Sequence, residues 1–111
     1  MNKRTINTII ISINTSDHKK VVVSLIVNGK VDTLERFADQ RKAQAVLPMI
    51  DTLLRRNNVD LKDITSVRVH NGPGSFTGLR VGIAIANTLG YLLQIPVNDN
   101  RVGQQVDAVY S

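Results

Sequence analysis

A glycine-rich segment at residues 71–80 (NGPGSFTGLR) constrains this chain more than any other. It follows a short apolar run at residues 64–70, which predicts a strand, and precedes a long apolar run at residues 75–93, which predicts a helix. A tight turn between a strand and a helix exposes backbone N–H groups, which suits either a bound anion or a close-packed neighbour. The role of the turn depends on which of these two it meets.

Two familiar phosphate-binding loops do not match this turn. A Walker A loop ends in Gly-Lys followed by Ser or Thr, whereas Gly78 is followed by Leu79 and Arg80. The dinucleotide fingerprint G-x-G-x-x-G also fails, because Thr77 occupies the place of its third glycine. Ser75 is a good N-cap residue for the helix that follows. We therefore expect a tight structural turn with Ser75 as the helix cap.

Small residues recur every four positions along the predicted helix, at Gly78, Gly82, Ala86 and Gly90. On a helix they form one stripe, over which another backbone can approach closely. Nearly all the other positions are apolar, so the helix must be buried on more than one side. We expect the sheet of this domain to cover one side, and a second polypeptide to dock on the stripe or its flank.

The order of the predicted elements indicates an α/β fold. Asn28-Gly29 is a strong hairpin turn, and Pro48 is expected to bend the first helix or fray its first half. The predicted strands are residues 6–14, 21–27, 31–37, 64–70 and 95–97; the predicted helices are residues 40–56 and 75–93, with an optional short helix carrying Val102, Val106 and Val109. The order β-β-β-α-β-α-β predicts a mixed sheet within one domain, residues 1–111.

Composition narrows the choice of partners and of compartment. The chain has no cysteine, which excludes disulfides and thiolate metal sites, and we expect a cytoplasmic location without signal peptide or membrane span. The net charge is +5, which favours an acidic partner. However, the basic residues fall in scattered pairs, and the four aromatic residues do not alternate with them as in a platform that stacks bases. We therefore favour a solvated surface with a mild excess of positive charge over direct contact with RNA.

Three segments resemble the TsaB family, whose members support TsaD in making threonylcarbamoyladenosine in tRNA. They are residues 13–16 (INTS), 46–51 (VLPMID) and 72–84 (GPGSFTGLRVGIA), and the resemblance extends over nearly the whole chain. It implies one lobe of the actin-like, Hsp70-like, sugar-kinase-like fold. The element order derived above agrees with that fold independently.

The chain departs from the pattern of this family in three places. Family members ordinarily carry a second lobe, which is absent here, so half a nucleotide pocket remains and we expect weak or absent ATP binding by this chain alone. Asn14 stands at the strand end where nucleotide-handling members of the fold place an aspartate, and a neutral amide cannot act as a carboxylate base. Lys42-Ala43 stands where relatives often show a His-Ser pair.

We expect no catalytic residue and no metal site in this chain. His18 and His70 share no ligand spacing with each other or with a pair of carboxylates. The segment at residues 74–78 (GSFTG) is not a G-x-S-x-G elbow, and no His-Asp pair accompanies its serine. Arg80 either pairs with an acidic group or faces water.

The resemblance implies a noncatalytic scaffold that activates a TsaD-type transferase. The implied contacts are a TsaD-type subunit through the helices, a TsaE-type ATPase through the complex, a second copy when TsaD is missing, tRNA indirectly, and ATP or ADP only at the complex interface; no membrane is involved. The residues expected to bind the partner are Gly72, Pro73, Gly74, Ser75, Phe76, Thr77, Gly78, Arg80, Gly82, Ala86, Leu47 and Ile50. If the stripe is the contact, Gly82→Leu abolishes the complex and leaves the domain folded.

Two alternatives stay open at this point. The first is a basic module that touches tRNA through its paired cations, which are Lys3-Arg4, Lys19-Lys20, Arg41-Lys42 and Arg55-Arg56. The second is a truncated lobe that associates with itself.

Overall fold

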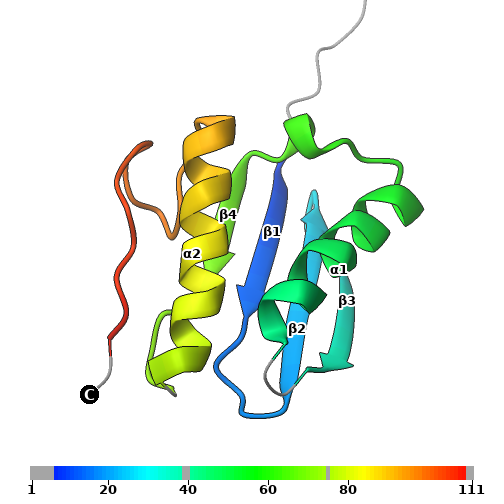
Figure 1. Ribbon diagram of the computed structural model, residues 1–111. Helices are drawn as coiled ribbons and strands as arrows, with labels where there is room; N and C mark the ends of the chain where they lie inside the picture. The colour runs from blue at the N-terminus through cyan, green and yellow to red at the C-terminus, as the bar shows by residue number, and fades with distance from the viewer. Residues whose placement is uncertain (1–6, 39–40, 75, 110–111) are drawn as a thin grey trace, which may run out of the picture.

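The computed structural model describes residues 7–38, 41–74 and 76–109, in which a four-stranded sheet carries two helices on one face (Figure 1). The strands are β1 (Ile9–Asn14), β2 (Lys20–Val27), β3 (Lys30–Phe37) and β4 (Ser66–Val69). They lie in the order β3-β2-β1-β4, with β1, β2 and β3 antiparallel and β4 parallel to β1. The predicted mixed sheet is confirmed.

The β2–β3 hairpin forms where the Asn-Gly pair predicts it. Asn28 (φ 50°) and Gly29 (φ 88°) both adopt positive φ, as a two-residue turn of this type requires. The Asn28 side chain also accepts a hydrogen bond from the Thr8 N–H at 2.9 Å, next to the start of β1. The turn therefore sets the register of three strands.

The helices are α1 (Lys42–Arg56) and α2 (Phe76–Leu93), with a short 3-10 turn η1 (Leu61–Asp63) between α1 and β4. Helix α1 runs through Pro48 without interruption, so the predicted fraying of its first half is wrong. Val46 and Met49, on either side of the proline, are fully buried, and their packing holds this half of the helix to the sheet. Neither helix of the described chain is long and apolar enough to cross a membrane.

The C-terminal part differs from the prediction. Only Val97 remains of the expected last strand, as a single parallel bridge to Val67. The prediction of an optional final helix is wrong, because residues 100–109 contain no helix and run beside α2 (Figure 1). Of the three valines that suggested it, only Val106 is buried, which leaves no apolar face for a helix to cover. Instead the Asn87 amide pairs with the backbone N–H (2.9 Å) and C=O (3.0 Å) of Val106.

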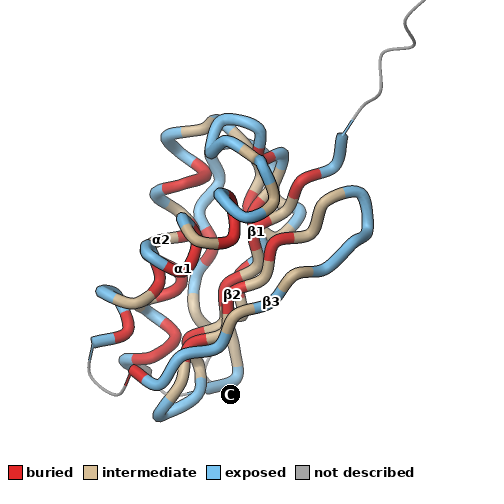
Figure 2. The backbone as a smooth tube through the Cα atoms, turned by 90° about the vertical axis from the view of Figure 1, so that its right-hand side faces the viewer, coloured by how far each residue is buried: buried red, intermediate tan, exposed pale blue. Residues whose placement is uncertain are grey.

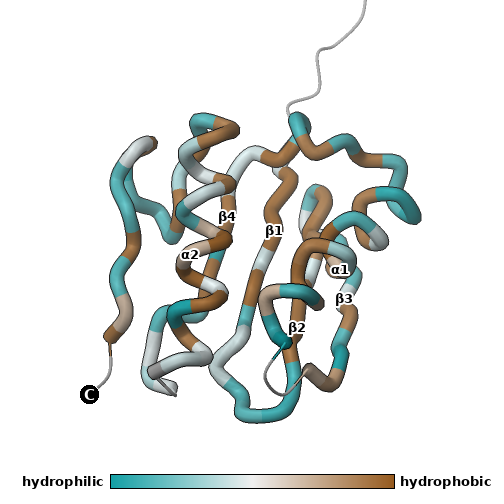
Figure 3. The backbone as a smooth tube through the Cα atoms, viewed as in Figure 1, coloured by the Kyte–Doolittle hydropathy of each residue, from teal (hydrophilic) through white to brown (hydrophobic). Residues whose placement is uncertain are grey.

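The core lies between the sheet and the two helices. Figure 2 shows buried positions alternating along β1 and β2, and Figure 3 shows brown, hydrophobic runs on these strands and on α2. The largest fully buried side chains include Ile11 and Ile13 of β1, Leu25 of β2, Met49 and Leu53 of α1 and Leu79 of α2.

Thr15, just after β1, joins the central strand to α2. Its side chain is fully buried, and its hydroxyl donates to the Gly78 carbonyl and accepts from the Gly82 N–H at 3.0 Å. These two backbone groups pair with each other in a regular helix, so the hydroxyl contacts both ends of one helical hydrogen bond. The Thr15 hydroxyl can come this close to the backbone of α2 only because Gly82 has no side chain.

The small-residue stripe therefore faces the sheet of its own domain. A Cβ atom added to Gly82 would lie 2.7 Å from Thr15 Oγ1, and one added to Gly90 would lie 2.5 Å from Val97 Cγ2. Ala86 is fully buried as well. The expectation that Gly82→Leu leaves the domain folded is wrong, because a leucine here would overpack the core.

Asp32 on β3 fastens the end of α1 to the edge of the sheet. Its carboxylate accepts hydrogen bonds from Arg56 Nε at 2.7 Å, from Arg56 Nη2, and from Asn57 Nδ2 at 2.8 Å. The Arg56 guanidinium, followed by the Asn57 amide, lowers the pKa of Asp32 to about 2. The ionised form of Asp32 is thus stabilised in the folded chain.

Thr15→Val should lower the free energy of unfolding by about 1–3 kcal/mol, because the Gly82 N–H loses a buried acceptor. Thr88→Val is the matched control: its hydroxyl bonds to Ala84 O at 2.8 Å on the exposed side of the same helix, and the expected change is within about 0.5 kcal/mol. Urea unfolding measures both. Equal effects would show that the Thr15 hydroxyl does not hold α2 on the sheet.

Asp32→Asn should destabilise the chain at pH 7 and have no such effect at very low pH. The pKa of Asp32 in the folded chain, about 2, lies well below that of an aspartate exposed to water in the unfolded chain, about 3.9. The contribution of this carboxylate is therefore complete above about pH 4 and is lost as the pH falls through about 2. Denaturant unfolding of both proteins across this range tests the sign. A stability difference that grew on acidification would contradict the assignment.

Candidate functional site

The glycine turn packs against other parts of the same chain. Gly72 has a φ of 148°, which favours glycine, and a Cβ atom placed on it would lie 1.9 Å from the Val109 carbonyl oxygen. A Cβ atom on Gly74 would lie 2.8 Å from the Cβ of Ser16. In this structure the glycines admit a close-packed neighbour of their own chain, the second of the two roles that the sequence left open.

The C-terminal segment supplies part of that neighbour. The Val109 N–H donates to the Asn71 carbonyl at 2.6 Å, and the Asn71 amide donates to the Asp107 carbonyl at 3.1 Å. His70 Nε2 lies 2.9 Å from the Pro73 carbonyl oxygen on the other side of the turn. These bonds fix the turn from residues that lie far apart in the sequence.

The β1 strand end is likewise occupied by internal contacts. Asn14 Oδ1 accepts hydrogen bonds from the Ser16 N–H at 2.9 Å and from the Ser16 hydroxyl at 2.7 Å. Lys42 is only 7% exposed, and its ammonium donates to the carbonyls of Thr15, at 3.0 Å, and Asp17. Lys42, which the tRNA-binding alternative places among the exposed paired cations, is therefore buried and holds this turn, a role that no motif in the sequence indicates.

The residues predicted to bind a partner separate into two groups. Gly78, Gly82, Ala86 and Ile50 are buried in the domain's own core, so the prediction that they face a partner is wrong. Pro73, Gly74, Thr77, Arg80 and Leu47 are exposed, and Gly72 is half-buried. Ser75 and the side chain of Phe76 lie outside the described part, so the predicted N-cap is not tested.

The flank of α2 that points away from the sheet is apolar and exposed. Leu92 is 67% exposed and Tyr91 70%, and Leu47 of α1 is 56% exposed. A groove of about 310 Å³ runs between the two helices; its lining residues are Leu47, Ala84, Ile85, Thr88, Leu89 and Leu92. We call this surface the α1–α2 groove. It contains no charged side chain, which is unusual for a surface exposed to water.

A second, more polar groove lies along the other side of α2. Its volume is about 580 Å³, and residues 105–108 of the C-terminal segment form one wall. Arg80, Asn87 and Asp107 contribute polar groups to it. The two grooves share Ala84, Thr88 and Leu92, so these three residues form a ridge with a hollow on each side.

The structure assembles no obvious centre for covalent chemistry in the part of the chain that it describes. His18 lies exposed in the β1–β2 turn, and His70 is engaged with Pro73. Within residues 7–38, 41–74 and 76–109, no three His, Cys, Asp or Glu side chains gather as metal ligands would. The most distinctive feature of the described surface is therefore the exposed, uncharged α1–α2 groove.

Comparison with known proteins places this geometry in a family. A model of the family "TsaD: tRNA N6-adenosine threonylcarbamoyltransferase" matches residues 34–99. The TsaB protein of Haemophilus influenzae is 35% identical over 75 residues, which cover 68% of this chain and 32% of that protein. The TsaB protein of Buchnera aphidicola subsp. Schizaphis graminum is 38% identical over 97 residues, covering 80% and 42% of the two proteins. The chain thus spans less than half the length of these relatives.

Solved structures agree with the sequence comparison. YeaZ from Pseudomonas aeruginosa superimposes with a TM-score of 0.76 at 30% identity, over 81% of this chain and 42% of that one. A reductive activator for a corrinoid, iron-sulfur protein, at 18% identity and a TM-score of 0.53, shares the fold alone. The match to the family model, the TsaB relatives and the YeaZ structure together show that this actin-like α/β chain belongs to the TsaB family.

Proposed function

We propose that this chain acts in tRNA threonylcarbamoyladenosine biosynthesis as a noncatalytic subunit that binds a TsaD-type transferase through the α1–α2 groove. The observation that carries the proposal is the uncharged α1–α2 groove, with the exposed Leu47 on the side of α1 and the exposed Leu92 on the side of α2. The names of the TsaB relatives and the match to the TsaD family model support the choice of pathway and of partner.

An apolar partner helix suits this groove. Leu47 of α1 and five residues of α2 line the groove, and an amphipathic helix fills an apolar groove with residues spaced three and four apart. A stable contact of ordinary size buries about 1,600 Å² in total, more than the groove alone provides. The exposed Thr77 and Arg80, in the first turns of α2, extend the surface toward the glycine turn.

The groove suggests how the subunit acts on its partner. The ridge stands on a helix that Thr15 and the sheet hold in place, so it presents a rigid surface to the transferase. Rigid docking can hold a mobile partner in its active arrangement without contributing a reacting group. The threonylcarbamoyl transfer belongs to the partner in this proposal.

The remaining expectations follow from the same assignment. A second copy of the chain occupies the groove when no TsaD-type subunit is present, and a TsaE-type ATPase joins only through the complex. The chain alone binds ATP weakly or not at all, because it provides one lobe of a pocket that lies between two. The complex works in the cytoplasm and meets tRNA through the transferase.

Leu92→Lys should weaken binding to a TsaD-type transferase at least about tenfold, because it puts a charge into an interface that excludes water. Val31→Lys is the matched control: Val31 is 65% exposed, against 67% for Leu92, but lies on β3, away from the groove. Isothermal titration calorimetry with the transferase measures both affinities, and thermal unfolding shows that both variants are folded. If Leu92→Lys binds as tightly as the wild type, the groove is not the contact.

A further inference from the structure

The fold brings several cations that are far apart in the sequence close to one exposed aromatic residue, Phe37. Of the basic pairs seen in the sequence, Lys3-Arg4 lies outside the described part, Lys42 is buried against two carbonyls, and Arg55 and Arg56 form ion pairs with Asp51 and Asp32. The Lys19-Lys20 pair and Arg41 remain. The backbone brings them to the same end of the sheet as Arg36 and Phe37.

Backbone pairing places the two lysines beside this aromatic residue. Lys20 is the cross-strand partner of Phe37, and the Ala38 N–H donates to the Lys19 carbonyl at 2.8 Å. Phe37 is 88% exposed, the highest value among the large hydrophobic residues of the described chain. An exposed aromatic ring with cations beside it is an arrangement on which a nucleic-acid base can stack.

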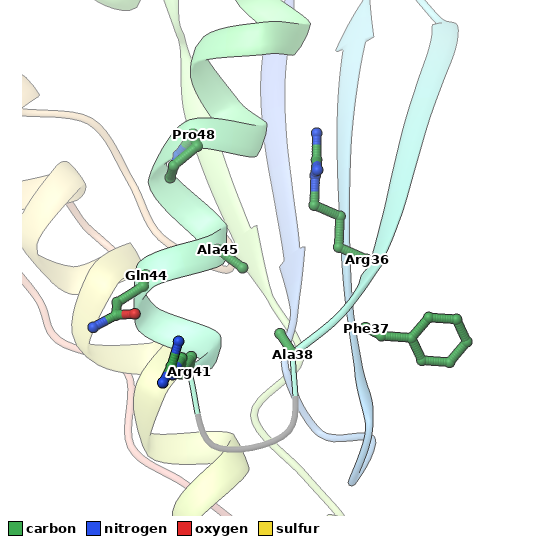
Figure 4. Close-up of a pocket in the computed structure, with 7 residues that line it drawn as sticks. All are labelled: Arg36, Phe37, Ala38, Arg41, Gln44, Ala45 and Pro48. Atoms are coloured by element: carbon green, nitrogen blue, oxygen red, sulfur yellow. The ribbon is translucent and has the colours of Figure 1, made fainter.

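The two arginines lie on the other side of the same strand end. Arg36, Phe37 and Arg41 line a cavity of about 790 Å³ between β3 and the first half of α1. Figure 4 shows Arg36 on the side of β3 that faces α1, Arg41 at the start of α1, and the Phe37 ring pointing away from α1. Among the described residues that line this cavity, none is acidic. A chain that passes around the edge of β3 can therefore meet cations in the cavity and the ring outside it.

The nearby carboxylates leave three of these cations unpaired. Glu35 lies 3.6 Å from Lys20, and the Asp17 carboxylate accepts the backbone N–H groups of Lys19 and Lys20. Within the described residues, no ion pair engages the side chains of Lys19, Arg36 or Arg41. Asp39, which lies next to this site in the sequence, is outside the described part.

We infer that Lys19, Lys20, Arg36, Phe37 and Arg41, which we call the Phe37 cluster, bind single-stranded RNA, with phosphates on the cations and an unstacked base on the Phe37 ring. Cations alone would suit any polyanion, but the exposed ring favours a ligand with free base faces. The choice of RNA over DNA rests on the proposed function in tRNA modification. The site lies on β2, β3 and the start of α1, apart from the α1–α2 groove.

The test measures the affinity of the chain for a fluorescently labelled single-stranded RNA of about ten nucleotides by anisotropy, at several salt concentrations. Phe37→Ala should weaken binding about tenfold and leave the salt dependence unchanged, because the ring stacks and carries no charge. The double variant Arg36→Gln/Arg41→Gln should weaken binding and flatten the salt dependence by about 1.4 in the slope of log K against log salt.

The matched control removes two exposed cations elsewhere, in Lys62→Gln/Arg101→Gln, and should change affinity less than twofold. If the wild type does not bind this RNA at low salt, or if the control weakens binding as much as the arginine pair does, the proposal is wrong. A polyglutamate peptide provides a further test. If this peptide displaces the RNA and binds the wild type and Phe37→Ala equally well, the cluster binds an acidic protein, and the RNA proposal is wrong.

Two further measurements separate this site from the proposed function. Leu92→Lys should bind RNA like the wild type, and Phe37→Ala should bind the TsaD-type transferase like the wild type. If Phe37→Ala loses RNA binding and both variants still bind the transferase, the RNA site is supported and the groove assignment is wrong. If Leu92→Lys alone fails with the transferase and Phe37→Ala binds RNA normally, the groove stands and the RNA site falls.

Discussion

The buried hydroxyl of Thr15 decides which side of α2 packs on the domain and which side is left exposed. It holds the backbone of Gly78 and Gly82 against the end of β1, at a distance that only a helix without side chains at this point permits. With this side of α2 fixed on the sheet, the branched residues on the opposite flank must point outward. The apolar ridge on the surface is thus a consequence of close packing in the interior.

The same constraint explains the position of the glycine turn. Since α2 lies directly against β1 and β4, the connection from β4 into the helix has little room, and Gly72 and Gly74 meet Val109 and Ser16 at distances that exclude a Cβ atom. Lys42 and Asn14 complete this end of the sheet by binding the groups of the β1–β2 turn. The end of the sheet is held by polar contacts, whereas the α1–α2 groove is left without charged side chains.

Local patterns in the sequence were enough to predict the elements and their order. Alternation in β1 and β2, the Asn28-Gly29 turn and the apolar periodicity of α1 and α2 depend on neighbours a few residues away, so they can be read directly. The neighbour of the small-residue stripe could not be predicted in this way. Spacing shows that small residues share one face of a helix, but it does not show what packs against that face. The predicted last helix failed for a related reason: three valines at suitable spacing do not form a helix when only Val106 finds a place in the core.

The sites were harder to predict than the fold because they combine distant residues. The α1–α2 groove joins Leu47 to Leu92, and the Phe37 cluster joins Lys19 to Arg41 through strand pairing. In the sequence these cations are scattered, and Phe37 is a single aromatic residue at the end of a mostly polar strand. No motif indicated the contacts of Thr15 and Lys42, because these contacts depend on burial, which only the folded chain defines.

Hydrogen exchange of the chain with and without a TsaD-type transferase tests the central claim most directly, because it reports on each element separately. If the transferase docks on the α1–α2 groove, exchange should slow in peptides from α1 and α2 that contain Leu47 and Leu92, with no change in β3. Protection confined to β3, or exchange in α1 and α2 that the transferase leaves unchanged, would contradict the claim that the outer flank of α2 is the docking surface.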